Sequence, residues 1–237
     1  MNRFSFAECR ARFEIDETFA DDNFIETDGP LEALPRMSFK RHGGKGNVIS
    51  GCAFHVASSA GGNVAFFLAE SDAVVSIGPH TRLNCDIRLW RSATVTIGAY
   101  TTINQARLVA DDSDIVIGED CMFSDSILIQ SADQHGLIDL ESMTFLNAKR
   151  RRIELGDHVW VGRRAIVMPD VTIGDGSVIG TASLVTKDAS ACSFVVGVPA
   201  RVVRAGSSWT RLPGKINQRE AAFFEKMRAV VFITESD

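Results

Sequence analysis

An aliphatic residue returns at every sixth position of this chain between residues 155 and 185. The six positions are Leu155, Val161, Val167, Ile173, Ile179 and Val185. A helix repeats every 3.6 residues and a strand every 2, so neither one long helix nor one long strand explains a period of six. A coil of short strands does explain it, because each six-residue side directs one aliphatic residue inwards and three sides close a triangle. The pattern predicts a parallel β-helix in which each coil consists of three such sides.

The repeat extends upstream with a longer step. Ile77, Ile97 and Ile117 occupy equivalent places in SIGPHTRL, TIGAYTTI and VIGEDCMF, and the two intervals between them are equal and slightly longer than three hexads. The span from Ile117 to Leu155 has the length of one such longer coil followed by one coil of three hexads. Within that span, residues 131–153 lack the six-residue period. We predict that they form a coil side carrying a protruding loop, and loops on rigid scaffolds commonly carry function.

These patterns divide the chain into three parts. Residues 1–45 have no clear period and are expected to cap the first coil, since the open end of a β-helix exposes unpaired backbone. Residues 46–206 form the β-helix domain, and residues 207–237 form a C-terminal extension. Asn217 followed by Glu220 predicts a capped helix there. Its apolar stripe is expected to pack against the coil or a neighbouring subunit, and comprises Phe223, Phe224, Met227, Val230 and Val231.

Composition excludes several classes of function. The formal net charge of −5 argues against a nucleic-acid-binding protein, which needs a basic face. No apolar run approaches the ~20 residues that span a bilayer, and charges interrupt the N-terminal sequence, which therefore does not resemble a signal peptide. The five cysteines are scattered without CxxC spacing. They indicate reduced, buried thiols in a cytoplasmic protein rather than disulfides or a zinc site.

Two longer motifs resemble those of a known enzyme family. GDHVWVGRRAIVMPDVTIGDGSVIGTASLVTKD, followed by VVGVPARVV, is similar to the C-terminal half of the hexapeptide-repeat acyltransferases. FSDSILIQSADQHGLIDL resembles the catalytic segment of sugar and polysaccharide O-acetyltransferases in that family, in particular those acting on capsular sialic acid or polysialic acid. The resemblance covers roughly residues 70–210. It implies an all-β, left-handed parallel β-helix, a homotrimer with active sites between subunits, and acetyl-CoA as cosubstrate without a metal.

His135 is the candidate catalytic residue. Acetyl transfer to a hydroxyl requires removal of the hydroxyl proton, and imidazole, with an ordinary pKa near 6.5, suits this at neutral pH. His135 lies in a polar segment beside Asp133 and before Asp139, and either carboxylate could orient the ring. A solvated loop histidine is the alternative interpretation. The DQH context and the position before the tryptophan-containing coil favour catalysis.

The resemblance assigns further residues to coenzyme A. It places Trp160 in the cofactor channel near the catalytic histidine, although packing at a subunit seam would also explain a tryptophan there. Gly162, Gly180 and Thr181 would lie beside the pantetheine arm, where small side chains allow close approach. Lys187, in the turn that begins with Thr186, and Arg201 would lie near the phosphates. The family more often has alanine or glycine at the position of Thr181.

Two candidates concern the acceptor. The run 149–152, with Arg163 and Arg164 one coil away, concentrates positive charge in an acidic protein. A solvated loop would explain it, and so would attraction of an anionic acceptor, for which we select Arg151. Asn104 could hydrogen-bond an acceptor hydroxyl, or it could belong to an asparagine ladder inside the coil.

The remaining histidines do not suggest a metal site. His80 and His158 fall at coil corners, where we expect surface residues, and His42 and His55 lie in poorly patterned sequence. The zinc carbonic anhydrases of this fold need three imidazoles, two of them close in sequence, and no such pair occurs on the predicted coils.

The sequence therefore predicts a cytoplasmic, trimeric enzyme that moves acetyl from acetyl-CoA to a hydroxyl of a sugar or cell-surface polysaccharide. An acidic glycan such as sialic acid would fit the basic run. An N-acetyltransferase acting on an amino sugar would share the same motifs. The alternative from another class is a β-helix scaffold or binding subunit that has lost catalysis.

Overall fold

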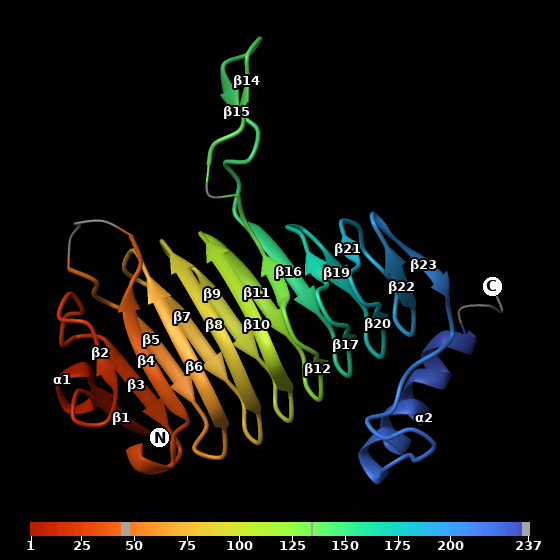
Figure 1. The fold of residues 1–237 in the computed structure, drawn as a ribbon, viewed down its shortest axis with the longest axis horizontal. Coiled ribbons are helices and arrows are strands. Elements are labelled where there is room, and N and C mark those ends of the chain that lie inside the picture. The colour runs from red at the N-terminus through yellow and green to blue at the C-terminus, as the bar shows by residue number, and fades with distance from the viewer. Residues whose placement is uncertain (44–47, 134, 234–237) are drawn as a thin grey trace.

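The computed structural model describes residues 1–43, 48–133 and 135–233, which wind into an elongated prism of stacked coils (Figure 1). One side of the prism is a sheet in the order β1-β3-β5-β7-β9-β11-β16-β19. Its strands are parallel except for the antiparallel pair of β1 and β3. They comprise Asn2–Ser5, Phe24–Thr27, Ala53–Val56, Val74–Ile77, Thr94–Ile97, Ser113–Ile117, Arg151–Leu155 and Thr172–Ile173.

A second sheet wraps the rest of the coil. It begins with single strands β2, β4, β6, β8 and β10, which are Glu14–Ile15, Arg36–Arg41, Gly61–Leu68, Arg82–Trp90 and Thr102–Asp111. Strand β10 then pairs with both β12 and β13, so the later coils have two separate sides here. One side contains β12, β17, β20 and β22, which are Met122–Phe123, Trp160–Val161, Val178–Ile179 and Phe194–Gly197. The other contains β13, β18 and β21, which are Ile127–Gln130, Ile166–Val167 and Leu184–Val185.

The six-residue period marks the interior of the prism, as predicted. Leu155 pairs with Ile173, Val161 with Ile179 and Val167 with Val185, so each residue pairs with the one three hexads later in the sequence. All six side chains are at most 1% exposed. Each coil therefore places one aliphatic residue per side in a continuous apolar core, and this burial is the main favourable contribution to folding.

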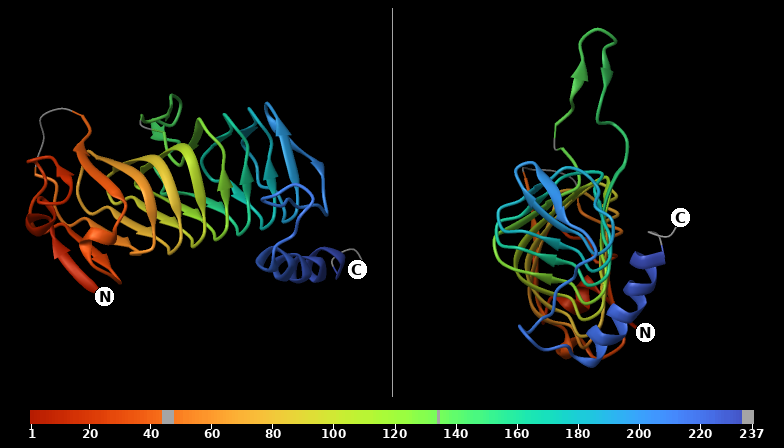
Figure 2. Two further views of the ribbon diagram at one scale, coloured as in Figure 1. Left: turned by 60° about the horizontal axis from the view of Figure 1, so that its bottom comes forward. Right: turned by 90° about the vertical axis from the view of Figure 1, so that its right-hand side faces the viewer.

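The division of the span from Ile117 to Leu155 into two coils was wrong. Ile117 pairs directly with Leu155, so these residues belong to adjacent coils. The surplus residues leave the prism after β13 as the expected protruding loop, whose arms form the antiparallel pair β14 (Ile138–Asp139) and β15 (Thr144–Phe145). Figures 1 and 2 show this hairpin projecting from one long edge. The loop happens to be about as long as one coil, so residue counting could not separate the two possibilities.

Two kinds of residue form the corner between the first sheet and β12. Glycines occupy the equivalent position in successive coils. A Cβ on Gly98 would lie 2.5 Å from the carbonyl carbon of Gly118, so a side chain there would collide with the next coil. Two residues later the backbone takes a left-handed conformation, with φ of 58° at His80, 61° at Tyr100 and 54° at His158. His80 and His158 therefore do occupy corners.

Residues 14–41 extend the ladders towards the N-terminus. Strands β2, β3 and β4 pair in parallel with β4, β5 and β6, with η1 (Leu31–Ala33) between β3 and β4. The end of the prism is closed by α1 (Phe6–Cys9), whose Phe6 ring packs 4.8 Å from Phe39, and Phe39 lies 4.9 Å from Phe66. The expected boundary between residues 45 and 46 falls within 44–47, outside the described residues.

The C-terminal part of the chain lies at the end of the prism opposite α1 (Figure 1). Strand β22 turns back into β23 (Ala200–Arg204), and a connecting segment leads to α2 (Gln218–Ile233). The predicted helix start is confirmed, because Asn217 Oδ1 accepts from the Glu220 N–H and a Glu220 carboxylate oxygen accepts from the Asn217 N–H. All five cysteines are buried and unpaired. No helix among the described residues has the length and apolarity needed to cross a bilayer.

Candidate active site

His135 lies at the base of the hairpin, with its ring exposed to solvent. Its backbone carbonyl accepts a hydrogen bond of 2.8 Å from Asn147 Nδ2, and Asn147 Oδ1 accepts one of 2.9 Å from the Leu137 N–H. Asn147 Nδ2 also donates to Asp133 Oδ2 at 3.2 Å. One asparagine therefore ties the two arms of the loop together through two backbone groups and the Asp133 carboxylate, without using the imidazole of His135.

The two carboxylates expected to orient the ring have other partners. Asp139 Oδ1 accepts from the N–H and hydroxyl of Ser142 and from the N–H of Glu141, and these bonds, above all those from Ser142, lower the pKa of Asp139. Asp139 thus stabilises the turn of the hairpin. Within the described part of the chain, neither Asp133 nor Asp139 bonds to the His135 ring. Orientation of His135 by Asp133 stays a prediction.

The basic run beside the loop is compensated by carboxylates. Arg151 lies between coils, 3.9 Å from Asp133 and 3.5 Å from Asp170, and its side chain is only 20% exposed. The other cations of the run pair in the same way: Lys149 with Asp170, Arg150 with Asp112 and Asp114, and Arg152 with Glu154. One coil away, Arg163 pairs with Asp125, whereas Arg164 is exposed and has no ion pair among the described residues. Most of these pairs join neighbouring coils, and they weaken the interpretation of the run as a free anion-attracting patch.

Two of the expected site residues carry buried donors without an acceptor. Trp160 Nε1 and Arg151 Nε have no hydrogen-bond partner among the described residues, although both atoms are shielded from solvent. Leaving such a donor unsatisfied costs about 1–3 kcal/mol. A ligand that brings an oxygen atom to either donor would remove that penalty. Both residues therefore fit a role in binding.

The residues assigned to coenzyme A lie on the last coils. Gly162 is needed for coil stacking, since an added Cβ would lie 2.7 Å from the backbone nitrogen of Thr181. An added Cβ on Gly180 would lie 2.4 Å from the side-chain atom Val196 Cγ1, which would have to shift. The other four are exposed on the surface: Thr181, Thr186, Lys187 and Arg201. Exposed polar and cationic side chains beside a close-packed backbone fit a phosphate-bearing cosubstrate. The roles of all six residues stay predictions.

Asn104 lies in an irregularity of β10, where the register with β8 shifts between Ile103 and Ala106. Its side chain is exposed on the outside of the prism. This position excludes the ladder of asparagines inside the coil and leaves Asn104 available for an acceptor hydroxyl.

The expected site residues do not converge within one chain. His135 and Lys187 belong to the edge that follows β13, β18 and β21, whereas Gly162 and Thr181 belong to the edge that follows β17 and β20. Trp160 is near the third edge, with its ring 6.0 Å from that of Trp209. The right-hand view of Figure 2, which looks along the prism, shows the hairpin and α2 on different edges.

The surface position expected for His158 was wrong, because this side chain is fully buried. Its Nδ1 lies 2.9 Å from Asp120 Oδ2, its Nε2 lies 3.0 Å from the carbonyl oxygen of Trp209, and its ring stacks on Trp209 at 4.3 Å. The Phe223 ring of α2 lies 4.7 Å from the His158 ring. The C-terminal extension thus shields a corner that would otherwise face solvent. No period in residues 207–216 signals this packing.

Arg211 completes this C-terminal latch, defined here as Asp120, His158, Trp209 and Arg211. Arg211 lies 2.9 Å from Asp120 Oδ1 and donates to the carbonyls of Tyr100, Asp120 and Cys121. Burial alone would raise the pKa of Asp120, but the hydrogen bond from His158 and the charge of Arg211 outweigh it and lower this pKa.

We expect acid to release the latch. A lowered pKa means that Asp120 contributes stability above its unfolded value of about 3.9, and that this contribution is lost as the pH falls through the lower folded value. The protection factors of the α2 amides, which correct for the intrinsic pH dependence of exchange, should therefore fall below about pH 4. In Asp120→Asn the exchange should be faster at neutral pH and should lose this acid step. An unchanged pH profile in the variant would contradict the assignment.

The comparisons with known proteins identify the repeat. Residues 152–187 match the family model of the bacterial transferase hexapeptide with six repeats. The repeat is the bacterial transferase hexapeptide. The structure of the polysialic acid-specific acetyltransferase NeuO matches with a TM-score of 0.80 at 23% identity, over 95% of this chain and 96% of that one. The hexapeptide fold is a left-handed parallel β-helix with a C-terminal helix, as predicted.

Curated relatives are similar to parts of the chain. A polysialic acid O-acetyltransferase from Escherichia coli O1:K1 / APEC is 33% identical over 138 residues, which is 58% of this chain and 45% of the relative. A galactoside O-acetyltransferase from Escherichia coli strain K12 is 28% identical over 134 residues, or 56% of this chain and 60% of the relative. The chain thus spans about half the length of these relatives.

Proposed function

We propose that the protein transfers an acetyl group from acetyl-CoA to a hydroxyl of a sugar or polysaccharide. The observation that carries this proposal is the exposed imidazole of His135 at the root of the hairpin, within a hexapeptide-repeat chain. Relatives named as O-acetyltransferases of polysialic acid and of galactosides support the reaction class and an acceptor with a sugar hydroxyl.

The proposed reaction is a direct transfer. The acceptor oxygen attacks the thioester carbonyl carbon while His135 removes the hydroxyl proton, and a tetrahedral intermediate forms. The carbon–sulfur bond then breaks, the acetyl ester remains on the sugar, and the coenzyme A thiolate takes the proton from His135. Positioning of His135 relative to the thioester is the contribution expected from the rigid coils.

We further propose that the active sites lie between subunits of a homotrimer. The positions of His135 and Gly162 on different edges support this, because edges of neighbouring prisms can meet where those of one prism cannot. The five free, buried thiols support a reducing, cytoplasmic location, where capsular polysaccharide could be acetylated before export.

Acceptor chemistry distinguishes the proposal from its alternatives. Release of coenzyme A should be measured with a panel of hydroxyl-bearing sugars, amino sugars, and polysialic acid. We expect acetyl esters, detected by mass spectrometry and removed by mild alkali. Alkali-stable amides on amino sugars would instead identify an N-acetyltransferase. If calorimetry detects no binding of coenzyme A, the protein is a non-catalytic scaffold.

A further inference from the structure

The outer face upstream of the hairpin contains charges that the fold leaves uncompensated. Arg88 and Arg107, on β8 and β10, have no carboxylate within ion-pair distance among the described residues, in contrast to the compensated run at 149–152. The Arg88 guanidinium lies over the Phe67 ring, 5.2 Å from its centroid, and Arg88 Nε is a buried donor without a described partner. Arg88 is therefore oriented, while its Nε donor has no acceptor in the part of the chain that the structure describes.

Aromatic side chains surround these arginines. The His42 ring meets Trp90 edge-on at 4.9 Å and Phe67 at 6.4 Å, and all three side chains are partly exposed. Burial, followed by the charges of Arg88 and Arg107, lowers the pKa of His42, which indicates a positive potential at this face. Partly exposed aromatic surface beside unpaired guanidinium groups suits a ligand with carboxylates and apolar ring faces.

The register places this face in line with His135. Phe67 pairs with Arg88, Arg88 with Val109, and Val109 with Gln130, across β6, β8, β10 and β13. Gln130 ends β13, and His135 follows shortly after it in the sequence. Neighbouring strands lie about 4.8 Å apart, so Arg88 is about 10 Å along the prism from Gln130. Figure 1 shows the hairpin rising from the prism beyond these strands.

We propose that His42, Phe67, Arg88, Trp90 and Arg107 form a binding site for a carboxylate-bearing polysaccharide acceptor, which runs along the prism from this face to His135. This inference rests on the proposed function and adds the place where a polymer binds away from the reacting hydroxyl. Asp86 carries a negative charge on the same face, which would repel such a polymer. It pairs with Arg107 in the register and lines the same hollow as Arg107.

Removing positive charge and removing negative charge from this face should change the Kd for an anionic polymer in opposite directions. The double variant Arg88→Gln/Arg107→Gln should raise the Kd for fluorescently labelled polysialic acid about tenfold, because two charge-assisted contacts are lost. It should also make binding less sensitive to salt. Asp86→Asn should lower the Kd. Labelled dextran, a neutral polymer, should show none of these changes. Lys215→Gln/Lys226→Gln removes the same charge from the C-terminal extension and serves as the matched control.

The outcomes distinguish failure of the proposed polysaccharide-binding site from failure of the proposed acetyl transfer. Anisotropy titrations need no acetyl transfer, so His135→Ala should bind polysialic acid like the unaltered protein. Equal Kd values in the arginine variant and its lysine control would overturn the binding site, even if the enzyme acetylates sugars. Polymer binding through Arg88 without acetyl transfer to any acceptor would overturn the proposed function alone. A changed oligomeric state of the arginine variant in sedimentation would show that a second copy covers this face, which also overturns the site.

Discussion

His135→Ala is expected to lower kcat by about 10²–10⁴-fold while leaving the fold unchanged. The variant removes the group that takes the acceptor proton, so the attacking oxygen must lose its proton to water. The loss should fall mainly on kcat, since the contacts expected to hold coenzyme A involve other residues. The fold does not depend on the ring, because Asn147 holds the backbone of His135 rather than its side chain.

The measurement is steady-state acetyl transfer together with calorimetry of coenzyme A binding. His55→Ala is the matched control, because His55 is a partly exposed histidine on β5 that pairs with Glu26 far from the hairpin. It should retain full activity. Retained activity in His135→Ala, with the acceptor that the unaltered enzyme prefers, would remove His135 from the mechanism.

The interior of the later coils could be predicted from sequence because every coil repeats the same burial. Leu155, Ile173 and their equivalents face one core at a fixed phase, so the period is visible without any structure. The capped start of α2 was equally visible, since Asn217 and Glu220 are local partners. Patterns that depend on one side chain and its near neighbours in the chain are readable in this way.

The first coils could not be predicted because their length varies. Phe24 pairs with Ala53 and Ala53 pairs with Val74, and the first of these two steps along the chain is clearly the longer. Large phenylalanines fill this part of the core in place of the aliphatic hexads, so no constant period remains. The packing, rather than a repeated motif, sets the register there.

The sequence allowed us to predict which residues belong to the candidate site, but not which side chains pair with one another there. The DQH segment pointed to His135, yet the neutralisation of Arg150 by Asp112 and Asp114 joins residues far apart in sequence. The burial of His158 likewise depends on Trp209, which lies far along the chain in the C-terminal extension. Contacts between distant coils and tails follow from three-dimensional packing, which a local pattern does not encode.

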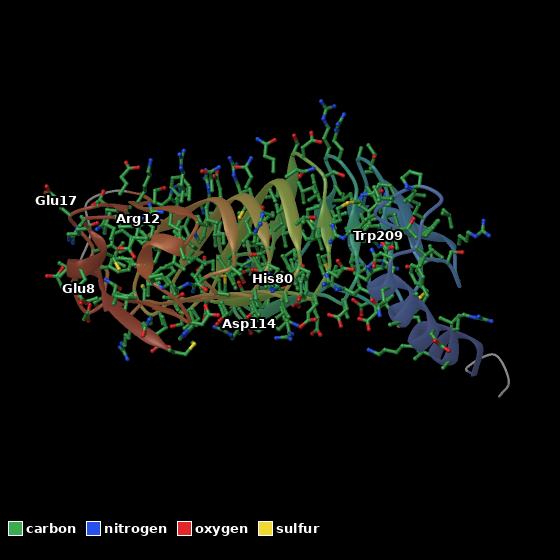
Figure 3. All side chains as sticks on the ribbon, turned by 90° about the horizontal axis from the view of Figure 1, so that it is seen from below. Glu8, Arg12, Glu17, His80, Asp114 and Trp209 are labelled. Atoms are coloured by element: carbon green, nitrogen blue, oxygen red, sulfur yellow. The ribbon has the colours of Figure 1, made fainter. Side chains whose placement is uncertain are left out.

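Trp209→Ala is expected to detach the C-terminal extension from the prism. The ring of Trp209 is 6% exposed, stacks on His158 and donates from Nε1 to the His158 carbonyl at 2.7 Å. Figure 3 places Trp209 at the C-terminal end of the prism, beside α2. Removing a buried tryptophan costs about 3–5 kcal/mol, which is a large share of the free energy that holds a single helix in place. A helix of this length is marginal in water without tertiary contacts, so α2 should also lose helicity.

Hydrogen exchange with mass spectrometry should show loss of protection in residues 207–233, while the coils from β5 to β21 stay protected. Thr210→Ala is the control, since the Thr210 hydroxyl donates to the nearby Leu212 carbonyl, and it should leave α2 protected. Because the Trp160 ring lies 6.0 Å from Trp209, release of the extension should also disturb Trp160 and raise the KM for acetyl-CoA severalfold. Unaltered protection of α2 in Trp209→Ala would contradict the prediction that Trp209 holds the extension on the prism.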